Sequence, residues 1–173
     1  RLRVGPGLDP ESEVGPLIDE VQRSHVHAHV TEAVEGGARL LCGGEPSPGP
    51  GFFYPPTVLA DVDDAMRVMR EETFGPVAPV RAVPSLEVAL ELANGTSYGL
   101  AATVLTGSQE DAQRAWRELA AGTVKVNAVW GGAPGGSAEP RRDSGLGLGY
   151  GPGLLDELTA AKVVHLEPAP PAG

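Results

Sequence analysis

The stretch from Val77 to Leu105, VAPVRAVPSLEVALELANGTSYGLAATVL, decides the fold class, because a strand pattern, a helix pattern and a second strand pattern follow one another in it. Val77–Val83 is predicted as a strand, and Pro79, which has no backbone N–H, indicates an edge strand or an irregular start. Ser85 is predicted to cap a helix whose apolar residues repeat with the helical period. They are Leu86, Ala89, Leu90 and Ala93. Ala101–Leu105 is predicted as the next strand.

The same alternation extends toward the N-terminus. Ile18–Glu35 is predicted as a helix, because its apolar residues follow the spacing of a single helix face. These residues are Val26, Val30, Ala33 and Val34. Gly36-Gly37 is predicted to end the helix, since glycine accepts the left-handed conformation of a helix cap. Ala38–Cys42 is then predicted as a short buried strand.

The alternation also extends toward the C-terminus. Ser108 and Asp111 resemble a capping box before another helix. The predicted apolar face of this helix is Ala112, Ala115, Trp116 and Leu119. Thr123–Val126 is predicted as the strand that follows. Strands that alternate with helices of this length predict an α/β fold with a mostly parallel sheet flanked by helices.

The last part of the chain is less regular. Trp130–Tyr150 is a long glycine-rich connection, and its length indicates either a function or disorder. Leu154–Ala161 is predicted as a final helix and Lys162–Leu166 as a final strand. We expect residues 1–160 to belong to one domain, of which they form a portion. We expect residues 161–173 to form a strand with a proline-rich tail.

Composition and charge narrow the classes of function. Lysine and arginine total 13 against 23 aspartate and glutamate residues, a net charge of −10, which argues against a nucleic acid or an anionic membrane surface as partner. We find no apolar run long enough to cross a bilayer and no pattern typical of a signal peptide. The single cysteine rules out a disulfide within the chain. We therefore expect a cytoplasmic location.

Glu71-Glu72-Thr73-Phe74-Gly75-Pro76-Val77 places two carboxylates, an aromatic ring and a rigid turn side by side. This motif is one of six short sequence blocks that follow one another along the chain. They are residues 9–17, 35–44, 53–59, 69–77, 93–102 and 121–127. Together these blocks resemble the C-terminal part of the catalytic domain of the aldehyde dehydrogenase superfamily. The resemblance implies an enzyme that oxidises an aldehyde with NAD or NADP.

The resemblance implies roles for two residues. In the family, the second glutamate of this motif binds the hydroxyls of the nicotinamide ribose, and that role falls to Glu72. A carboxylate accepts two hydrogen bonds from a vicinal diol, which makes the contact selective. The phenylalanine lies against the nicotinamide end of the cofactor, and that role falls to Phe74. Without the other blocks, a helix end and a turn, with Phe74 filling a core, would be the favoured interpretation of the motif.

The family's remaining machinery is expected outside this chain. Its cysteine nucleophile forms a thiohemiacetal and then a thioester, which a glutamate-activated water hydrolyses. Both residues belong to segments that precede this one in the family, so we assign no catalytic residue here. We also assign no metal ligand. We expect the N-terminal part of the enzyme as a partner of this chain. Lys162–Leu166 resembles the family's strand that crosses to a second subunit, which implies a homo-oligomer. The alternative is a strand that closes its own sheet.

Departures from the family pattern concentrate after Asn127. Ala138 stands where an aromatic residue often lines the aldehyde pocket, and Glu139 and Pro140 replace two glycines. Arg142 replaces a lysine with the same charge. These changes bear on the substrate pocket, and they leave open an alternative function. In that alternative, the protein is a catalytically inactive aldehyde dehydrogenase-like module with a structural or assembly role.

Other residues invite functional interpretations with ordinary alternatives. Cys42 lacks a nearby histidine or acid in sequence, so a buried packing role is favoured over a nucleophile. His25 and His29 share a helix face while His27 points away, and a solvated face is favoured over a metal site. Asn127 ends a predicted strand, where either a site or a turn is an equally good account. The alternating glycines of residues 145–151 are interpreted as a flexible loop, not a phosphate loop.

Overall fold

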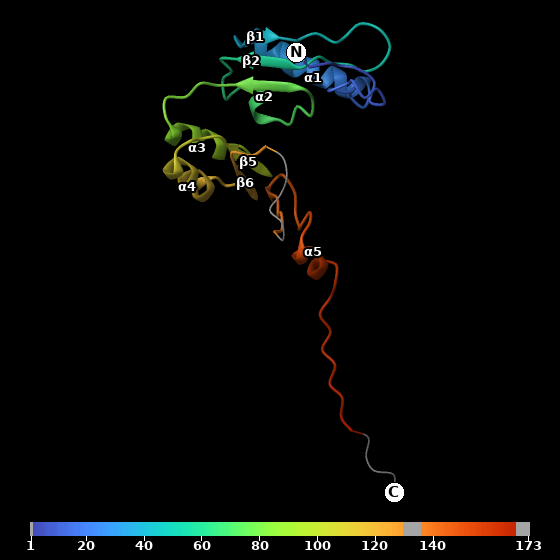
Figure 1. The fold of residues 1–173 in the computed structure, drawn as a ribbon, viewed down its shortest axis with the longest axis vertical. Coiled ribbons are helices and arrows are strands. Elements are labelled where there is room, and N and C mark those ends of the chain that lie inside the picture. Colours follow the sequence, from blue (N-terminus) through green and yellow to red (C-terminus); the bar gives the residue numbers. More distant parts are fainter. Residues whose placement is uncertain (1, 130–135, 169–173) are drawn as a thin grey trace. The chain divides into compact units, whose positions relative to one another are not determined.

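The computed structural model describes residues 2–129 and 136–168 (Figure 1). The chain divides into two compact units, Arg1–Leu92 and Ala93–Gly173, and each is described by itself. Helices and strands alternate in both units, which confirms the α/β class. Within the described residues, no helix is both long enough and apolar enough to span a membrane.

The first unit contains a three-stranded sheet with a long helix packed against it (Figure 1). Its elements are α1 (Glu20–Glu35), β1 (Arg39–Cys42), β2 (Thr57–Ala60), α2 (Arg67–Arg70) and β3 (Val77–Val80). β1 and β2 are antiparallel, while β2 and β3 are parallel, with Thr57 opposite Val77. β3 lies at the sheet edge, as Pro79 predicts, because a residue without an N–H is tolerated there. β2 is a strand that the sequence pattern did not predict.

Local signals set both ends of α1. The Asp19 side chain accepts a hydrogen bond from the backbone N–H of Gln22 at 2.8 Å, so the helix begins at Glu20, two positions after the predicted start. Gly36 is the C-cap, and Gly37 adopts a φ of 103°, which glycine accepts without steric cost. The predicted glycine stop is confirmed.

The core of this unit lies between α1 and the segments around β2. Its buried apolar side chains are Val26, Val30, Ala33, Ala38, Tyr54, Leu59, Val62 and Val68. The predicted helix face is correct except at Val34, which is 40% exposed. His29 is fully buried instead, so the buried stripe of α1 keeps the other predicted residues and is shifted from Val34 toward His29.

The prediction that β1 is buried is wrong. Leu40 is 41% exposed and Leu41 is 52% exposed. β1 pairs only with β2, and no described element of the chain covers both of its faces. The apolar run therefore identified a strand correctly, but it could not tell whether a second layer covers that strand.

The second unit is built from short strands and helices. α3 (Leu86–Asn94) leads into it, and its further elements are β4 (Tyr98–Gly99), β5 (Ala101–Val104), α4 (Gln109–Glu118), β6 (Thr123–Val126), β7 (Arg141–Arg142) and α5 (Pro152–Glu157). β5 and β6 are parallel, and β4 and β7 are antiparallel. Ser108 caps α4 by accepting from the Asp111 N–H at 3.1 Å, as predicted. Trp116, a member of the predicted apolar face of α4, is 52% exposed.

The C-terminal segment differs from the prediction in two respects, the bounds of its helix and its final strand. α5 ends at Glu157, earlier than the predicted Ala161. The prediction of a strand at Lys162–Leu166 is wrong for this chain, because these residues are exposed and pair with no strand within the described residues. They therefore do not close a sheet formed by the described residues. Their pairing with the edge of a sheet in a second subunit stays a prediction. Residues 130–135 of the glycine-rich connection lie outside the described residues.

Candidate functional site

Glu72 and Phe74 lie on the loop between α2 and β3, residues 71–76. Glu71 is the C-cap of α2, with extended backbone angles. Phe74 has a φ of 47°, a left-handed conformation that a bulky residue rarely adopts. Phe74 is 74% exposed, and Glu72 is exposed as well. The ring therefore does not fill the core of this chain, and strained backbone of this kind is typical of functional sites.

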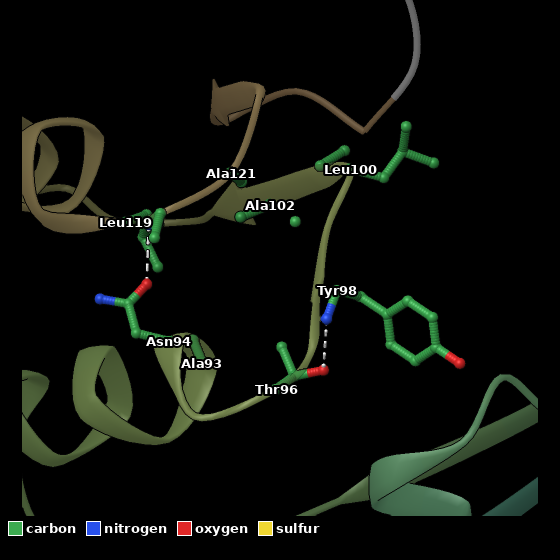
Figure 2. Close-up of a pocket in the computed structure, with 11 residues that line it drawn as sticks. Ala93, Asn94, Thr96, Tyr98, Leu100, Ala102, Leu119 and Ala121 are labelled. Atoms are coloured by element: carbon green, nitrogen blue, oxygen red, sulfur yellow. Dashed lines mark hydrogen bonds between the residues drawn. The ribbon is translucent and has the colours of Figure 1, made fainter. Parts of the chain in front are cut away.

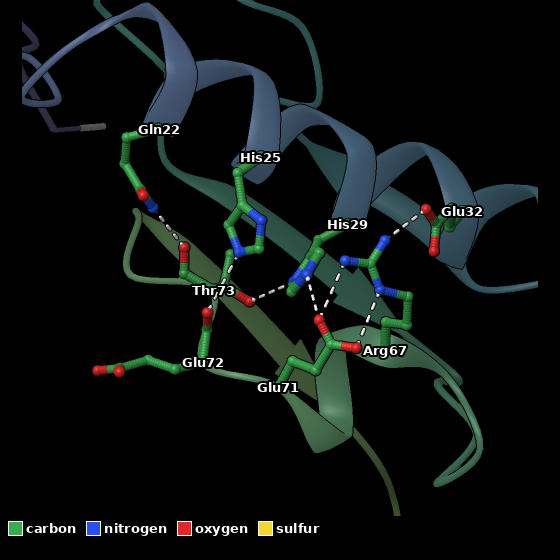
Figure 3. A network of polar contacts seen from close by, with 8 residues as sticks. All are labelled: Gln22, His25, His29, Glu32, Arg67, Glu71, Glu72 and Thr73. Carbon is green, nitrogen blue, oxygen red and sulfur yellow. Dashed lines mark hydrogen bonds and ion pairs between the residues drawn. The ribbon is translucent and has the colours of Figure 1, made fainter.

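Helix α1 holds the backbone of this loop through side chains from successive turns of one face (Figure 3). Gln22 donates through Nε2 to the carbonyl oxygens of Thr73, at 2.9 Å, and Phe74, at 3.1 Å. His25 Nε2 lies 3.3 Å from the carbonyl oxygen of Glu72. Because these contacts reach main-chain oxygens, they fix the loop without occupying the side chains that it presents.

His29 continues the same face and lies underneath the loop. It is fully buried, with Nδ1 3.1 Å from the Thr73 hydroxyl and Nε2 3.4 Å from a carboxylate oxygen of Glu71. Burial lowers the pKa of His29, and the neighbouring His25 and Arg67 lower it further. Glu71 opposes that shift, but the neutral imidazole remains favoured.

Arg67 ties this cluster to α2 and back to α1 (Figure 3). Its guanidinium donates to both carboxylate oxygens of Glu71, at 3.1 and 3.0 Å, and to Glu32 at 2.7 Å. The hydrogen bond from Arg67 lowers the pKa of the Glu71 carboxyl. Glu71 is therefore a charged structural anchor, whereas the adjacent Glu72 points away from the cluster into solvent (Figure 3).

The histidine predictions are partly confirmed. His25 and His29 share a face, with ring centroids 4.2 Å apart, and His27 instead approaches the Tyr54 hydroxyl at 3.2 Å. The prediction of a solvated face is wrong for His29, because it packs under the loop. Within residues 2–129 and 136–168, no three histidine, cysteine or acidic side chains are arranged to hold a metal ion.

The side chains of Cys42 and Asn127 contact nearby backbone atoms. Cys42 is exposed, so the predicted buried packing role is wrong, and its thiol lies 3.7 Å from the Pro56 carbonyl oxygen. Asn127 has a φ of 53° and exchanges two hydrogen bonds with the backbone of Thr106, at 2.8 and 2.9 Å. Its side chain is thus used to close a turn, which favours the turn interpretation.

The segment that departs from the family pattern, residues 138–142, packs closely against other parts of the second unit. The carbonyl of Glu139 lies where a Cβ on Gly122 would stand, so only glycine fits at Gly122. Arg142 donates to the carbonyl oxygens of Asn94, at 2.7 Å, and Thr96, at 2.6 Å. The positive charge expected at Arg142 therefore binds the C-terminal end of α3, where carbonyls are free.

A separate pocket of about 210 Å³ lies in the second unit (Figure 2). Backbone and small side chains line most of it, with Asn94, Thr96 and Tyr98 as its polar members. Asn94 is committed to structure, because it donates to the Glu118 carbonyl and accepts from the Ala120 N–H. Neither Glu72 nor Phe74 lines this pocket, so it does not add to the site on the loop.

Comparison with known proteins shows the family to which the chain belongs. The profile described as "Aldehyde dehydrogenase family" matches residues 1–164. The chain belongs to the aldehyde dehydrogenase family. It is 41% identical over 172 residues to a betaine aldehyde dehydrogenase of Cereibacter sphaeroides, and 40% identical over 168 residues to a succinate-semialdehyde dehydrogenase of Paenarthrobacter nicotinovorans.

Solved aldehyde dehydrogenase structures agree with this assignment. A lactaldehyde dehydrogenase from Escherichia coli superimposes with a TM-score of 0.90 at 38% identity, over 95% of this chain and 35% of the other. A Mycobacterium tuberculosis aldehyde dehydrogenase in complex with NAD+ gives 0.86 at 38% identity, over 92% and 33%. The match to the betaine aldehyde dehydrogenase includes 98% of this chain but only 35% of the relative. The chain therefore spans about a third of that protein's length.

Sequence reasoning missed the residues that support the loop. Gln22 and His29 were not assigned any relation to Glu72 or Phe74. A signal was present, since polar Gln22, His25 and His29 recur with the helical period beside an apolar stripe. Periodicity alone did not reveal what would lie against them.

Proposed function

We propose that the complete protein is an NAD(P)-dependent aldehyde dehydrogenase and that this chain contributes Glu72 and Phe74 to the binding of the nicotinamide end of its cofactor. The supporting observation is the loop itself. Its main chain is fixed by α1, while the Glu72 carboxylate and the Phe74 ring remain exposed. Exposing an aromatic ring on a strained residue is unfavourable for folding alone, which supports a binding role.

The two side chains suit the proposed ligand chemically. A free carboxylate can accept hydrogen bonds from both hydroxyls of a ribose, and the face of an aromatic ring suits a flat heterocycle. When bound, the nicotinamide supplies the hydride acceptor that aldehyde oxidation requires. Glu72 and Phe74 would hold and orient that ring, and the fixed backbone would reduce the entropy lost on binding.

The relatives support a nicotinamide cofactor without choosing one. A structural neighbour carries NAD+, and a succinate-semialdehyde dehydrogenase of Mycobacterium avium, 41% identical over 128 residues, is named for NADP(+). We propose NAD or NADP for this protein accordingly. The proposal also includes an aldehyde substrate, a cysteine nucleophile outside this chain, a cytoplasmic location and a homo-oligomer joined through Lys162–Leu166.

The test uses the full-length protein that contains this chain. We expect NAD(P)H to form only when an aldehyde is added, measured by absorbance. Glu72→Gln should raise the KM and Kd for the cofactor by about tenfold, the effect of losing about 1.4 kcal/mol of charge-assisted hydrogen bonding. Glu35→Gln, an exposed carboxylate at the end of α1, is the matched control and should leave both constants unchanged.

Two results would overturn this proposal. Equal cofactor affinity in Glu72→Gln and the control would remove Glu72 from the cofactor site. A folded full-length protein that binds no NAD(P) and oxidises no aldehyde would favour the inactive, structural module instead.

A further inference from the structure

Three side chains on one face of α1 hold the loop of residues 71–76. Gln22 and His25 reach main-chain oxygens near its exposed end. His29 differs from both, because it contacts the side chains of Thr73 and Glu71. Thr73 and Glu71 flank Glu72 on both sides in sequence, so a change at His29 acts on the residues next to the proposed ribose contact.

The contacts of His29 favour one of the two neutral tautomers of its imidazole ring. Nε2 is buried beside a carboxylate oxygen, 3.4 Å away, and its geometry is too poor for a full hydrogen bond. A proton on Nε2 makes this approach attractive, whereas a lone pair there would be repelled by the Glu71 charge. Nδ1 then accepts a hydrogen bond from the Thr73 hydroxyl at 3.1 Å.

We propose that His29 is a positioning residue for the cofactor loop: through Thr73 and Glu71 it holds Glu72 and Phe74 in the conformation that binds NAD(P). The inference rests on the proposed function, in which Glu72 and Phe74 contact the cofactor. His29 is fully buried, so it acts through the loop and does not itself meet the ligand. It controls how well the cofactor binds and leaves the chemical step unchanged.

The charges around His29 belong to all of the elements that pack on it. On α1 these are His25 and Glu32, on α2 Arg67, and on the loop Glu71. Arg67 binds both acids, so Glu71 keeps its charge and its place while the imidazole stays neutral. The cluster therefore fixes the position of Glu71 from one side by Arg67 and from the other by His29.

The decisive variants change the Thr73 contact in the full-length enzyme with minimal loss of packing. Thr73→Val replaces the hydroxyl with a methyl group of similar size and leaves Nδ1 of His29 without a partner. We expect the cofactor Kd and KM to rise about three- to tenfold, with kcat at saturating cofactor unchanged, because one buried hydrogen bond is lost. Thr73→Ser retains a hydroxyl and should keep the wild-type constants.

A second pair of variants tests His29 directly. His29→Asn can offer an amide oxygen near the position of Nδ1, whereas His29→Leu offers no acceptor. We expect the cofactor Kd to rise less in His29→Asn than in His29→Leu. A purely packing role for His29 predicts the reverse order, because leucine fills an apolar site better than asparagine.

Particular results would overturn the inference. One is a lower melting temperature with unchanged cofactor Kd in Thr73→Val, which would make the contact merely structural. Another is a fall in kcat at unchanged KM. Glu72→Gln separates this inference from the proposed function: if Glu72→Gln weakens cofactor binding and Thr73→Val does not, only the positioning role fails. If neither variant changes the Kd, the assignment of the loop to the cofactor fails.

Discussion

Gly75 lies so close to Val26 that a Cβ atom on Gly75 would stand 2.5 Å from the Cγ2 atom of Val26. Val26 is fully buried in the core, and Gly75 does not have a positive φ, so the need for glycine is one of space alone. The absence of a side chain at Gly75 lets the loop approach α1 closely enough for Gln22 and His29 to reach it.

Gly75→Ala should therefore push the loop away from α1. We expect a loss of about 1–3 kcal/mol of stability, the usual cost of overpacking, together with weaker cofactor binding. Val26→Ala removes the methyl groups that the new Cβ would meet. The double variant should consequently recover cofactor affinity relative to Gly75→Ala, measured by titration of full-length protein; an additive or larger loss in the double variant would contradict the steric explanation.

Phe74 should separate binding from stability. It is 74% exposed, so Phe74→Ala removes little buried surface, and we expect the melting temperature to stay close to that of the wild type. Cofactor affinity should fall, because the exposed ring is proposed to lie against the nicotinamide. Thermal unfolding and cofactor titration of the same preparation check both outcomes. A marked fall in melting temperature would show that the ring packs against another part of the complete protein.

The buried His29 predicts how stability depends on pH. Its pKa is lowered in the folded protein, chiefly by burial, so the unfolded chain binds a proton more readily between the folded value and 6.5. The stabilisation by neutral His29 is complete above that window and is lost as pH falls through it. The melting temperature of wild type should fall more steeply below pH 6.5 than that of His29→Gln, which cannot take up this proton. Parallel curves would contradict a lowered pKa.

Tyr54 predicts a second, alkaline effect. Burial raises the pKa of its phenol to about 12, and the nearby Glu45 adds to the shift. The unfolded value is near 10.0, so the stabilisation is complete below that pH and is lost as pH rises toward about 12. Tyr54→Phe should cost about 1 kcal/mol, because the hydroxyl donates to the Gly44 carbonyl at 2.9 Å. The difference in phenolate absorbance between wild type and Tyr54→Phe during an alkaline titration measures this ionisation.

Local rules were sufficient for much of the fold. The Gly36-Gly37 stop of α1, the Ser108 cap of α4 and the edge position of Pro79 each depend on backbone chemistry within a few residues. These features are predictable because the causes lie close together along the chain.

Predictions that depended on burial were less successful. The period of a helix or strand tells which residues share a face, but not whether another element covers that face. Trp116 and Val34 were therefore placed on the apolar faces of their helices, although both are exposed. β1 was expected to be buried and is an exposed edge strand, for the same reason.

The sequence by itself determined where α1 ends and where α4 is capped, that the class is α/β, and that Glu72 and Phe74 belong to the motif for which a cofactor role is proposed. Only the tertiary structure decided that His29 is buried and that it meets Thr73, 44 positions away. The physical reason is that such a contact requires α1, α2 and the loop to pack together. Chain regions distant in sequence come together only when the core between α1 and β2 closes, and no local pattern specifies which polar groups then face one another.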